Sequence, residues 1–299
     1  MEHAKSVLYV LLAVFGVVFV AAWVRASRVA RAEARLKSVV PTPYQLLVGV
    51  ITDFLDTLGI GSFATTTALY RTRRTIDDRL LPGTLNVGHT IPTIVQAYIM
   101  FKAVEVDPAT LVSMIAAALL GAWFGAGFVA QWSRRRVQAV MGAALLLIGG
   151  VIIFRLSVET VSGVATGLSG GRLAIGVAGN FVLGVLMTMG VGLCALCFVL
   201  VWLLGMNLTT AFPIMMGSCA FLMPVASLRF LREKCVDLRA TVGLTLGGIP
   251  AVLVAGLIVK ELDVENVKKL VVVVVLYTAI SLILAARRAS AASDPVPTT

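Results

Sequence analysis

Residues 57–62 read Thr57-Leu58-Gly59-Ile60-Gly61-Ser62, and residues 188–193 echo them as Thr188-Met189-Gly190-Val191-Gly192-Leu193. The two stretches lie 131 positions apart, and the same offset separates Pro82 from Pro213. Gly and Pro residues that recur at a near-constant offset in an apolar chain are typical of transporters built from two homologous halves around a midplane site. The pattern therefore predicts an internally duplicated membrane protein.

The composition excludes an ordinary soluble domain. The chain of 299 residues is 59% hydrophobic and 13% charged, and its mean hydropathy is +0.97. Stretches of about 20 apolar residues recur between residues 6 and 286, and each is long enough to cross the hydrocarbon core. The net charge of +10 does not indicate nucleic-acid binding, because the basic residues sit in short loops between apolar segments.

The basic loops predict the topology. They cover residues 25–37, 71–79, 134–136, 229–239 and 287–288, and the positive-inside rule places all of them in the cytoplasm. Residues 6–24 then form an anchor helix that starts outside, because a run of arginines follows it. We expect residues 1–40 to hold this anchor, 41–156 the first repeat, 173–288 the second repeat and 289–299 a disordered tail, with the N-terminus outside and the C-terminus cytoplasmic.

Counting the segments between basic loops predicts inverted repeats. Residues 44–70 begin and end on one side and break at the Gly-Ile-Gly stretch, so we expect a hairpin that dips to mid-membrane. Residues 173–204 should dip from the other side. Three crossings follow each hairpin, at 81–101, 108–130 and 137–154, and at 212–230, 240–259 and 268–286. Because three is odd, the second repeat is inverted, and the predicted fold is an all-α polytopic bundle with re-entrant half-helices.

The two breaks are candidate anion sites. A break leaves free N–H groups at the start of the next half-helix, and those groups together with the positive dipole end favour an anion. The starts lie at Gly59–Ser62 and at Gly190–Leu193, which leads into Cys194. The alternative is that these glycines only allow close helix packing.

Two carboxylates lie in an apolar segment. Asp53 and Asp56 are three residues apart and share one helix face, and each costs about 2.5–3.5 kcal/mol at a membrane centre. The pair suits a proton-coupling group, could equally hold a cation, or could bond neighbouring threonines as structural glue. The second half has Gly184 and Met187 at the corresponding positions, so the carboxylates belong to the first half alone.

A polar run marks the first full crossing. Residues 83–92 contain Asn86, His89 and Thr90 before Pro92. A buried histidine near carboxylates can relay protons, and the three polar side chains can donate to an oxyanion. The alternative is a structurally satisfied histidine. The counterpart in the second half, residues 215–224, contains Ser218 and ends at Pro224, and both prolines are expected to kink their helices.

The four cysteines predict no redox or metal chemistry. Cys194 and Cys197 have C-x-x-C spacing but lack the strand-turn-helix context of a redox motif. We interpret Cys194, Cys197 and Cys219 as small residues that pack between helices. We expect no disulfide, no structural metal and no cofactor.

The motif pattern resembles the TauE/SafE sulfite-exporter family of permeases. The resemblance rests on Gly59–Ser62, Gly83–Asn86, Gly190–Gly192 and Pro213–Pro224, and it covers about residues 44–286. It implies a permease that moves small sulfur-containing anions, such as sulfite, sulfoacetate or thiosulfate, across the bacterial inner membrane.

The leading hypothesis is a secondary transporter for a small oxyanion, coupled to protons, and not an enzyme. Its partners are the anion and the lipid bilayer, and the sequence leaves a homodimer open. Rival hypotheses are a cation or metal permease that uses Asp53, Asp56, His89 and Asn86, and an intramembrane aspartyl hydrolase. Candidate substrate-binding residues are Gly59, Gly61, Ser62, Thr65, Asn86, His89, Thr90, Gly190, Gly192, Cys194 and Ser218, and candidate proton-coupling residues are Asp53, Asp56 and His89.

Overall fold

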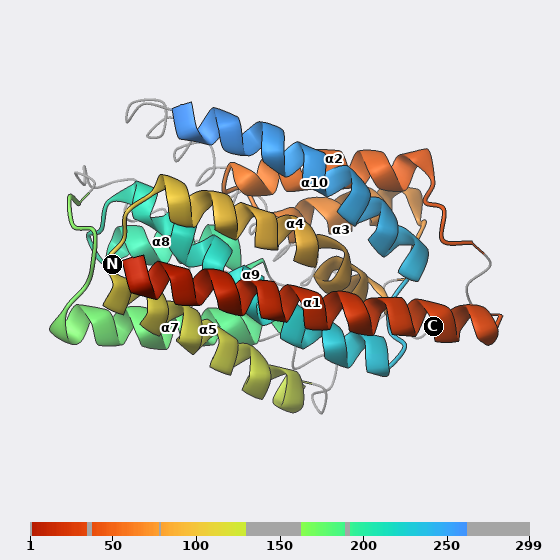
Figure 1. Ribbon diagram of the computed structural model, residues 1–299, viewed down its shortest axis with the longest axis horizontal. Helices are drawn as coiled ribbons and strands as arrows, with labels where there is room; N and C mark the ends of the chain where they lie inside the picture. The colour runs from red at the N-terminus through yellow and green to blue at the C-terminus, as the bar shows by residue number, and fades with distance from the viewer. Residues whose placement is uncertain (1, 35–37, 78, 130–162, 189–191, 262–299) are drawn as a thin grey trace, which may run out of the picture.

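The computed structural model describes residues 2–34, 38–77, 79–129, 163–188 and 192–261, and within them the elements are helices that lie side by side along one long axis (Figure 1). They are α1 (Glu2–Ala32), α2 (Pro43–Thr57), α3 (Ser62–Arg73), α4 (Leu81–Ala103), α5 (Pro108–Val129), α7 (Gly170–Thr188), α8 (Leu193–Leu203), α9 (Ala211–Arg232) and α10 (Leu238–Glu261), with a short 3₁₀ turn η1 (Leu208–Thr210) before α9. The predicted all-α fold is confirmed.

Five helices of the described part are long and apolar enough to cross a membrane, namely α1, α5, α7, the η1–α9 segment and α10. The predicted crossing at 81–101 forms α4, whose 23 residues would also suffice in length. α4 is more polar than those five helices, and its polar residues Thr84, Asn86, His89 and Gln96 are buried inside the protein. A helix that faces protein on most sides can carry such groups where lipid could not accept them.

The first predicted hairpin is formed by α2 and α3. A capping box between Thr42 and Gln45 starts α2, and Pro43 occupies its first turn. The break follows at Gly59 and Gly61, whose φ angles of +92° and +91° are readily adopted only by glycine. The hydroxyl of Tyr44 at the start of α2 donates to the carbonyl of Leu69 near the end of α3, at 2.7 Å. The chain therefore enters and leaves the hairpin at the same end.

The second predicted hairpin is formed by α7 and α8. The segment before α7 meets the segment after α8, where the main-chain N–H of Asn207 donates to the carbonyl of Ala165 at 2.8 Å. The two arms are unequal, since α7 has 19 residues and α8 has 11. By length α7 could cross a membrane alone, whereas α2, with 15 residues, is shorter than a full span.

The hairpins open at opposite ends of α4. At its start, Thr84 Oγ1 accepts a hydrogen bond from the N–H of Asp237, at 2.9 Å, and Leu81 packs in one cluster with Tyr70 of α3 and Ala240. Just beyond its other end, the N–H of Asp107 donates to the carbonyl of Thr166, ahead of α7, at 3.0 Å. This is the arrangement that inverted repeats would give, and the inversion itself stays a prediction. The expected crossings at 137–154 and 268–286 and the tail at 289–299 lie outside the described residues.

Corresponding helix pairs pack through glycine. A Cβ on Gly49 of α2 would lie 2.9 Å from the Cα of Leu244 of α10, and one on Gly247 would collide with the carbonyl of Leu46. Likewise, a Cβ on Gly125 of α5 would lie 2.8 Å from the Cα of Val185 of α7. The offset that relates the halves exchanges α2 with α7 and α10 with α5, so the two close pairs are equivalent. Small residues let helix backbones approach without lipid between them.

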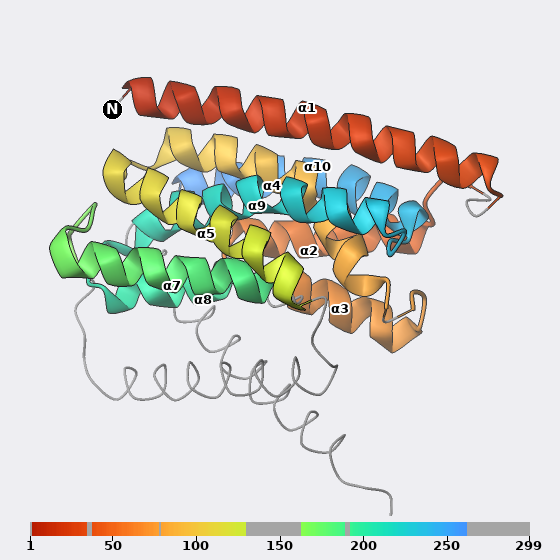
Figure 2. The same cartoon turned by 90° about the horizontal axis from the view of Figure 1, so that it is seen from below.

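The anchor helix α1 covers one side of this bundle, alongside α4 and α9 (Figure 2). Tyr98 of α4 stacks on Tyr9 of α1, with ring centroids 5.0 Å apart, and its hydroxyl donates to the Tyr9 carbonyl at 2.8 Å. Among the described helices of the second half, none corresponds to α1, as expected for a helix that precedes the first predicted repeat.

The basic loops of the described part gather at one end. Lys234, in the α9–α10 loop, lies 3.0 Å from Glu33 at the end of α1, and Arg239 donates to the carbonyl of Val40 at 2.7 Å. The opening of the α2–α3 hairpin lies at the same end, because Tyr70 near the end of α3 packs in one cluster with Ala240 near the start of α10. An exposed ion pair of this kind adds at most about 1 kcal/mol, so these contacts mark position more than they stabilise. The loops at 134–136 and 287–288 lie outside the described residues.

Helix packing through glycine predicts a stability effect. A Cβ at Gly184 of α7 would collide with the main-chain carbonyl of Ala118 on α5. We expect Gly184→Ala to lower the stability of the detergent-solubilised protein by about 1–3 kcal/mol, because the backbones must separate. Gly171→Ala is the matched control on the same helix, since nothing lies within 4 Å of its added methyl. Thermal unfolding monitored by size-exclusion chromatography measures both, and equal midpoints for the two variants would contradict the packing.

The placement of the hairpins predicts sidedness. Cys235 lies in the α9–α10 loop, and the exposed residues Thr72 and Ser169 lie at the mouths of the two hairpins. We expect a membrane-impermeant maleimide to reach Cys235 and Thr72→Cys from the cytoplasmic side and Ser169→Cys from the opposite side. The introduced cysteines are tested with Cys235→Ser. Labelling of positions 72 and 169 from the same side would rule out inverted hairpins.

Candidate functional site

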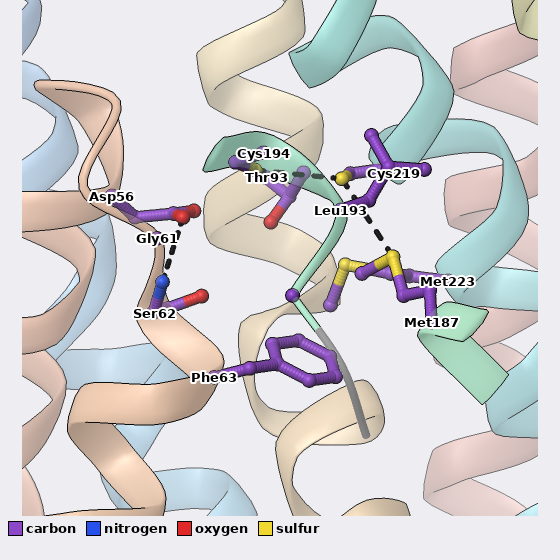
Figure 3. Close-up of a pocket in the computed structure, with 11 residues that line it drawn as sticks. Asp56, Gly61, Ser62, Phe63, Thr93, Met187, Leu193, Cys194, Cys219 and Met223 are labelled. Carbon is purple, nitrogen blue, oxygen red and sulfur yellow. Dashed lines mark hydrogen bonds between the residues drawn. The ribbon is translucent and has the colours of Figure 1, made fainter. Parts of the chain in front are cut away.

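A small pocket lies where α3 and α8 begin, between the two hairpin tips (Figure 3). Its lining comes from both halves of the chain. The residues are Asp56, Gly61, Ser62, Phe63, Thr93, Met187, Gly192, Leu193, Cys194, Cys219 and Met223. The two helix starts, far apart in sequence, are thus brought to one buried place.

The first half supplies oxygen and nitrogen. Ser62 is the first residue of α3, and its main-chain N–H donates to Asp56 Oδ1 at 2.8 Å. Gly61 at the cap position has no side chain to accept this bond, so a carboxylate from the end of α2 satisfies it instead. Asp56 is 2% exposed and Ser62 is 4% exposed. A carboxylate at the positive end of the helix dipole is favourably placed.

The second half supplies sulfur. Cys194 Sγ on α8 lies 3.6 Å from Cys219 Sγ on α9, and Cys219 Sγ lies 3.8 Å from Met187 Sδ at the end of α7. Met223, one turn after Cys219, also lines the pocket. Figure 3 shows the sulfur atoms of Cys219, Met187 and Met223 on the side of the pocket opposite Asp56 and Ser62, with Cys194 between the two sides. The cysteines are free thiols, so the wall is apolar and polarizable.

A second buried polar group lies behind the tip of the first hairpin. His89 Nδ1 on α4 lies 2.8 Å from Asp53 Oδ1, and its Nε2 lies 3.0 Å from Thr66 Oγ1 on α3. The single hydroxyl proton of Thr66 is given to the carbonyl of Ser62 at 2.7 Å, so the network assigns a proton to His89 Nε2. One further proton is then shared between Nδ1 and Asp53. The pair therefore carries no net charge, which suits its burial.

The surroundings of this pair are closely packed. Asp53 and His89 are both fully buried. Gly248 of α10 lies so close to Asp53 Oδ2 that a Cβ there would collide with it. Gln96 of α4 donates to Thr57 Oγ1 at 2.9 Å, next to the end of α2. The network therefore joins α2, α3 and α4 and fixes the tip from behind.

The structure brings only some of the candidate residues to the pocket. Gly61, Ser62, Gly192, Cys194 and Asp56 line it. Gly59 packs against Phe212 and Met215 instead. Gly190 lies outside the described residues.

The other candidate side chains make hydrogen bonds within or between helices. Thr65 donates to the carbonyl of Ser62 at 2.8 Å, and Asn86 donates to that of Pro82 at 2.8 Å. Thr90 donates to the carbonyl of Asn86 at 2.5 Å and lies 3.2 Å from Ser227 Oγ. Ser218 accepts from Asn180 Nδ2 at 2.8 Å. These four side chains, like His89, are not among the pocket-lining residues.

The sequence reasoning missed several lining residues. Thr93, Met187, Cys219 and Met223 were not candidates, yet all line the pocket. One signal was available for Met187, because it stands 131 positions after Asp56 and so occupies the equivalent place at the second tip. Thr93, Cys219 and Met223 had no such signal, since their inward facing depends on how α4 and α9 are rotated.

The residues of the metal hypothesis do not converge. Among the described residues there is no group of three or more His, Cys, Asp and Glu side chains able to hold a metal ion. Asp53 and His89 bond each other, and Asn86 bonds its own helix.

Comparison with known proteins gives one match. A family model described as Sulfite exporter TauE/SafE matches residues 172–299. No curated protein and no solved structure matches the chain. The matched range holds α7 to α10 and thus the sulfur side of the pocket, while Asp56 and Ser62 precede it. Together with the apolar helices, the match indicates a multi-pass membrane protein. Residues 172–299 are thus similar to the TauE/SafE family, a family of membrane transporters for sulfur anions such as sulfite, and over this range the resemblance seen in the sequence is confirmed.

Proposed function

We propose that the protein is a proton-coupled secondary transporter for a small sulfur-containing anion such as sulfite, sulfoacetate or thiosulfate. It acts in the bacterial inner membrane with its basic loops in the cytoplasm. The binding site is the pocket between the hairpin tips. The observation that carries the proposal is that the first N–H of α3 is held by a carboxylate, Asp56, inside a pocket that both half-helices face.

Anion binding follows from the helix starts. The first turns of α3 and α8 leave main-chain N–H groups without partners inside the helix. Both helices begin at the pocket wall, at Ser62 and Leu193. Two positive dipole ends that meet in a water-poor site favour negative charge there.

Proton coupling follows from the position of Asp56. Its carboxylate already occupies the N–H that an anionic substrate would use. An anion and an ionised carboxylate at one buried place repel each other strongly. A proton on Asp56 removes that repulsion and turns the carboxyl group into a donor to the substrate. The anion and a proton should therefore bind together.

The Asp53–His89 pair supports this role from behind. Asp53 lies one helical turn before Asp56 on the same face of α2. The neutral pair can lose or gain a proton, and either change alters the charge next to Asp56. We propose that the pair tunes the coupling while Asp56 meets the substrate.

The rival hypotheses have less support. A cation permease would need Asp53, Asp56, His89 and Asn86 around one ion, and only Asp56 lines the pocket. An aspartyl hydrolase would need two carboxylates at one substrate, whereas Asp53 faces His89 behind the tip.

Asp56→Asn tests the coupling directly. The amide oxygen can still accept from the Ser62 N–H, so we expect the protein to fold and to exchange sulfite. The variant should lose the whole component of transport driven by a pH gradient, because no proton can bind at this position. Proteoliposome uptake of radiolabelled sulfite, with and without a pH gradient, measures this.

Asp237→Asn is the matched control, since Asp237 caps the start of α10 far from the pocket and accepts from the Ala240 N–H at 2.9 Å. It should keep the gradient-driven component. Unchanged gradient dependence in Asp56→Asn would refute a coupling role for this carboxyl, and uptake of divalent cations in place of sulfite by the unmodified protein would replace the anion proposal.

Asp53→Asn separates tuning from coupling. Asn can donate to His89 Nδ1 and keep the pair neutral, so the fold should survive. Because the pair can no longer change its charge through the carboxylate, the pH at half-maximal uptake should change while the gradient-driven component remains. An identical pH profile would make the pair purely structural. Measuring uptake from pH 5 to 8 decides between these results.

A further inference from the structure

We propose that the sulfur wall makes the pocket selective for anions that expose a sulfur atom, and that Met187, Cys194, Cys219 and Met223 exclude sulfate. Sulfite exposes the lone-pair face of its sulfur and thiosulfate exposes a terminal sulfur, whereas the four oxygens of sulfate cover its centre. Of the three anions named under the proposed function, the inference therefore favours sulfite and thiosulfate over sulfoacetate, whose sulfur is covered by three oxygens and a carbon. This inference rests on the proposed function and assigns the specificity of the same site.

The pocket is chemically divided along the boundary between the repeats. Hydrogen-bonding groups come from α2, α3 and α4, through Asp56, Ser62 and Thr93. The facing wall comes from α7, α8 and α9 and carries two thiols and two thioethers. The division is built at equivalent positions, because Met187 stands where the first half has Asp56. One tip thus offers a carboxyl group and the other a thioether.

The sulfur wall has little to offer an oxyanion oxygen. A thioether donates no hydrogen bond, and a thiol is a weak donor. The two thiols and Met187 also lie against each other, with sulfur separations of 3.6 Å and 3.8 Å. An oxygen pressed against these sulfur atoms, away from the main-chain N–H groups at the start of α8, would lose its water without replacement, which is costly. Discrimination by leaving the wrong ligand unsatisfied is an effective source of specificity.

A sulfur atom suits the same wall. It is larger, more polarizable and less strongly hydrated than a charged oxygen, and thioether and thiol groups make favourable contacts with polarizable partners. The oxygens of the bound anion can then turn to Ser62, Thr93 and the protonated Asp56. The two walls together therefore match an anion with an oxygen side and a sulfur side.

The test is competition against radiolabelled sulfite in proteoliposomes of the full chain. In the unmodified protein we expect thiosulfate to inhibit uptake at a concentration at least about tenfold lower than sulfate. Cys219→Ser replaces one sulfur by an oxygen that donates well, so sulfate should gain about threefold to tenfold in potency. Cys197→Ser is the matched control, because Cys197 is fully buried nearby but does not line the pocket.

Two variants of Met187 provide a second test in case Cys219→Ser does not fold. Met187→Leu keeps the wall apolar and should still exclude sulfate, whereas Met187→Gln supplies an amide donor of similar length and should admit it. Size-exclusion chromatography checks that each variant is folded.

The outcomes separate the two proposals. If no sulfur anion is transported by the unmodified protein, the proposed function fails. If sulfite is transported and sulfate competes as well as thiosulfate, only the specificity inference is overturned. It is also overturned if Cys219→Ser and Met187→Gln leave the order of the competing anions unchanged.

Discussion

Everything in this structure depends on how two interrupted helices satisfy their main-chain groups inside a membrane. The first turn of a helix leaves N–H groups without partners, and hydrocarbon cannot supply them. Here the starts of α3 and α8 face each other across a pocket in place of lipid. At α3 the first N–H, that of Ser62, donates to the carboxylate of Asp56. Under the proposed function, a substrate anion would compete with this carboxylate for the N–H of Ser62.

The rest of the helix bundle fixes the positions of the two hairpin tips relative to each other. Glycines bring α2 against α10 and α5 against α7 so closely that an added methyl would meet main-chain atoms. Polar side chains on α4 then fasten the first tip from behind, with His89 bonded to Asp53 and Thr66. Since helices in lipid gain little from hydrophobic association, close packing and buried hydrogen bonds must supply the cohesion. The same contacts that hold the fold therefore fix the geometry of the pocket.

The duplication does not make the halves chemically equal. Asp53 and Asp56 in the first half correspond to Gly184 and Met187 in the second. Gly184 serves contact between α5 and α7, and Met187 forms part of the sulfur wall. The scaffold therefore places two helix starts at one pocket, while the side chains give that pocket an oxygen side and a sulfur side. Burial makes this difference effective, because unsatisfied groups cost most where water is absent.

The sequence by itself determined the all-α membrane class and the places where the helices break, because glycine spacing, hydropathy and basic loops are local signals of how a chain meets a membrane, while the inverted repeat stays a prediction. It also singled out Asp53, Asp56 and His89, since ionisable groups in apolar segments are costly. Only the tertiary structure decided that Asp56 faces the pocket while Asp53 turns to His89. It alone placed Thr93, Cys219 and Met223 in the lining, and Asn86, Thr90 and Ser218 in helix contacts. These differences depend on the rotation and crossing of helices from both halves, which no spacing along a single helix records.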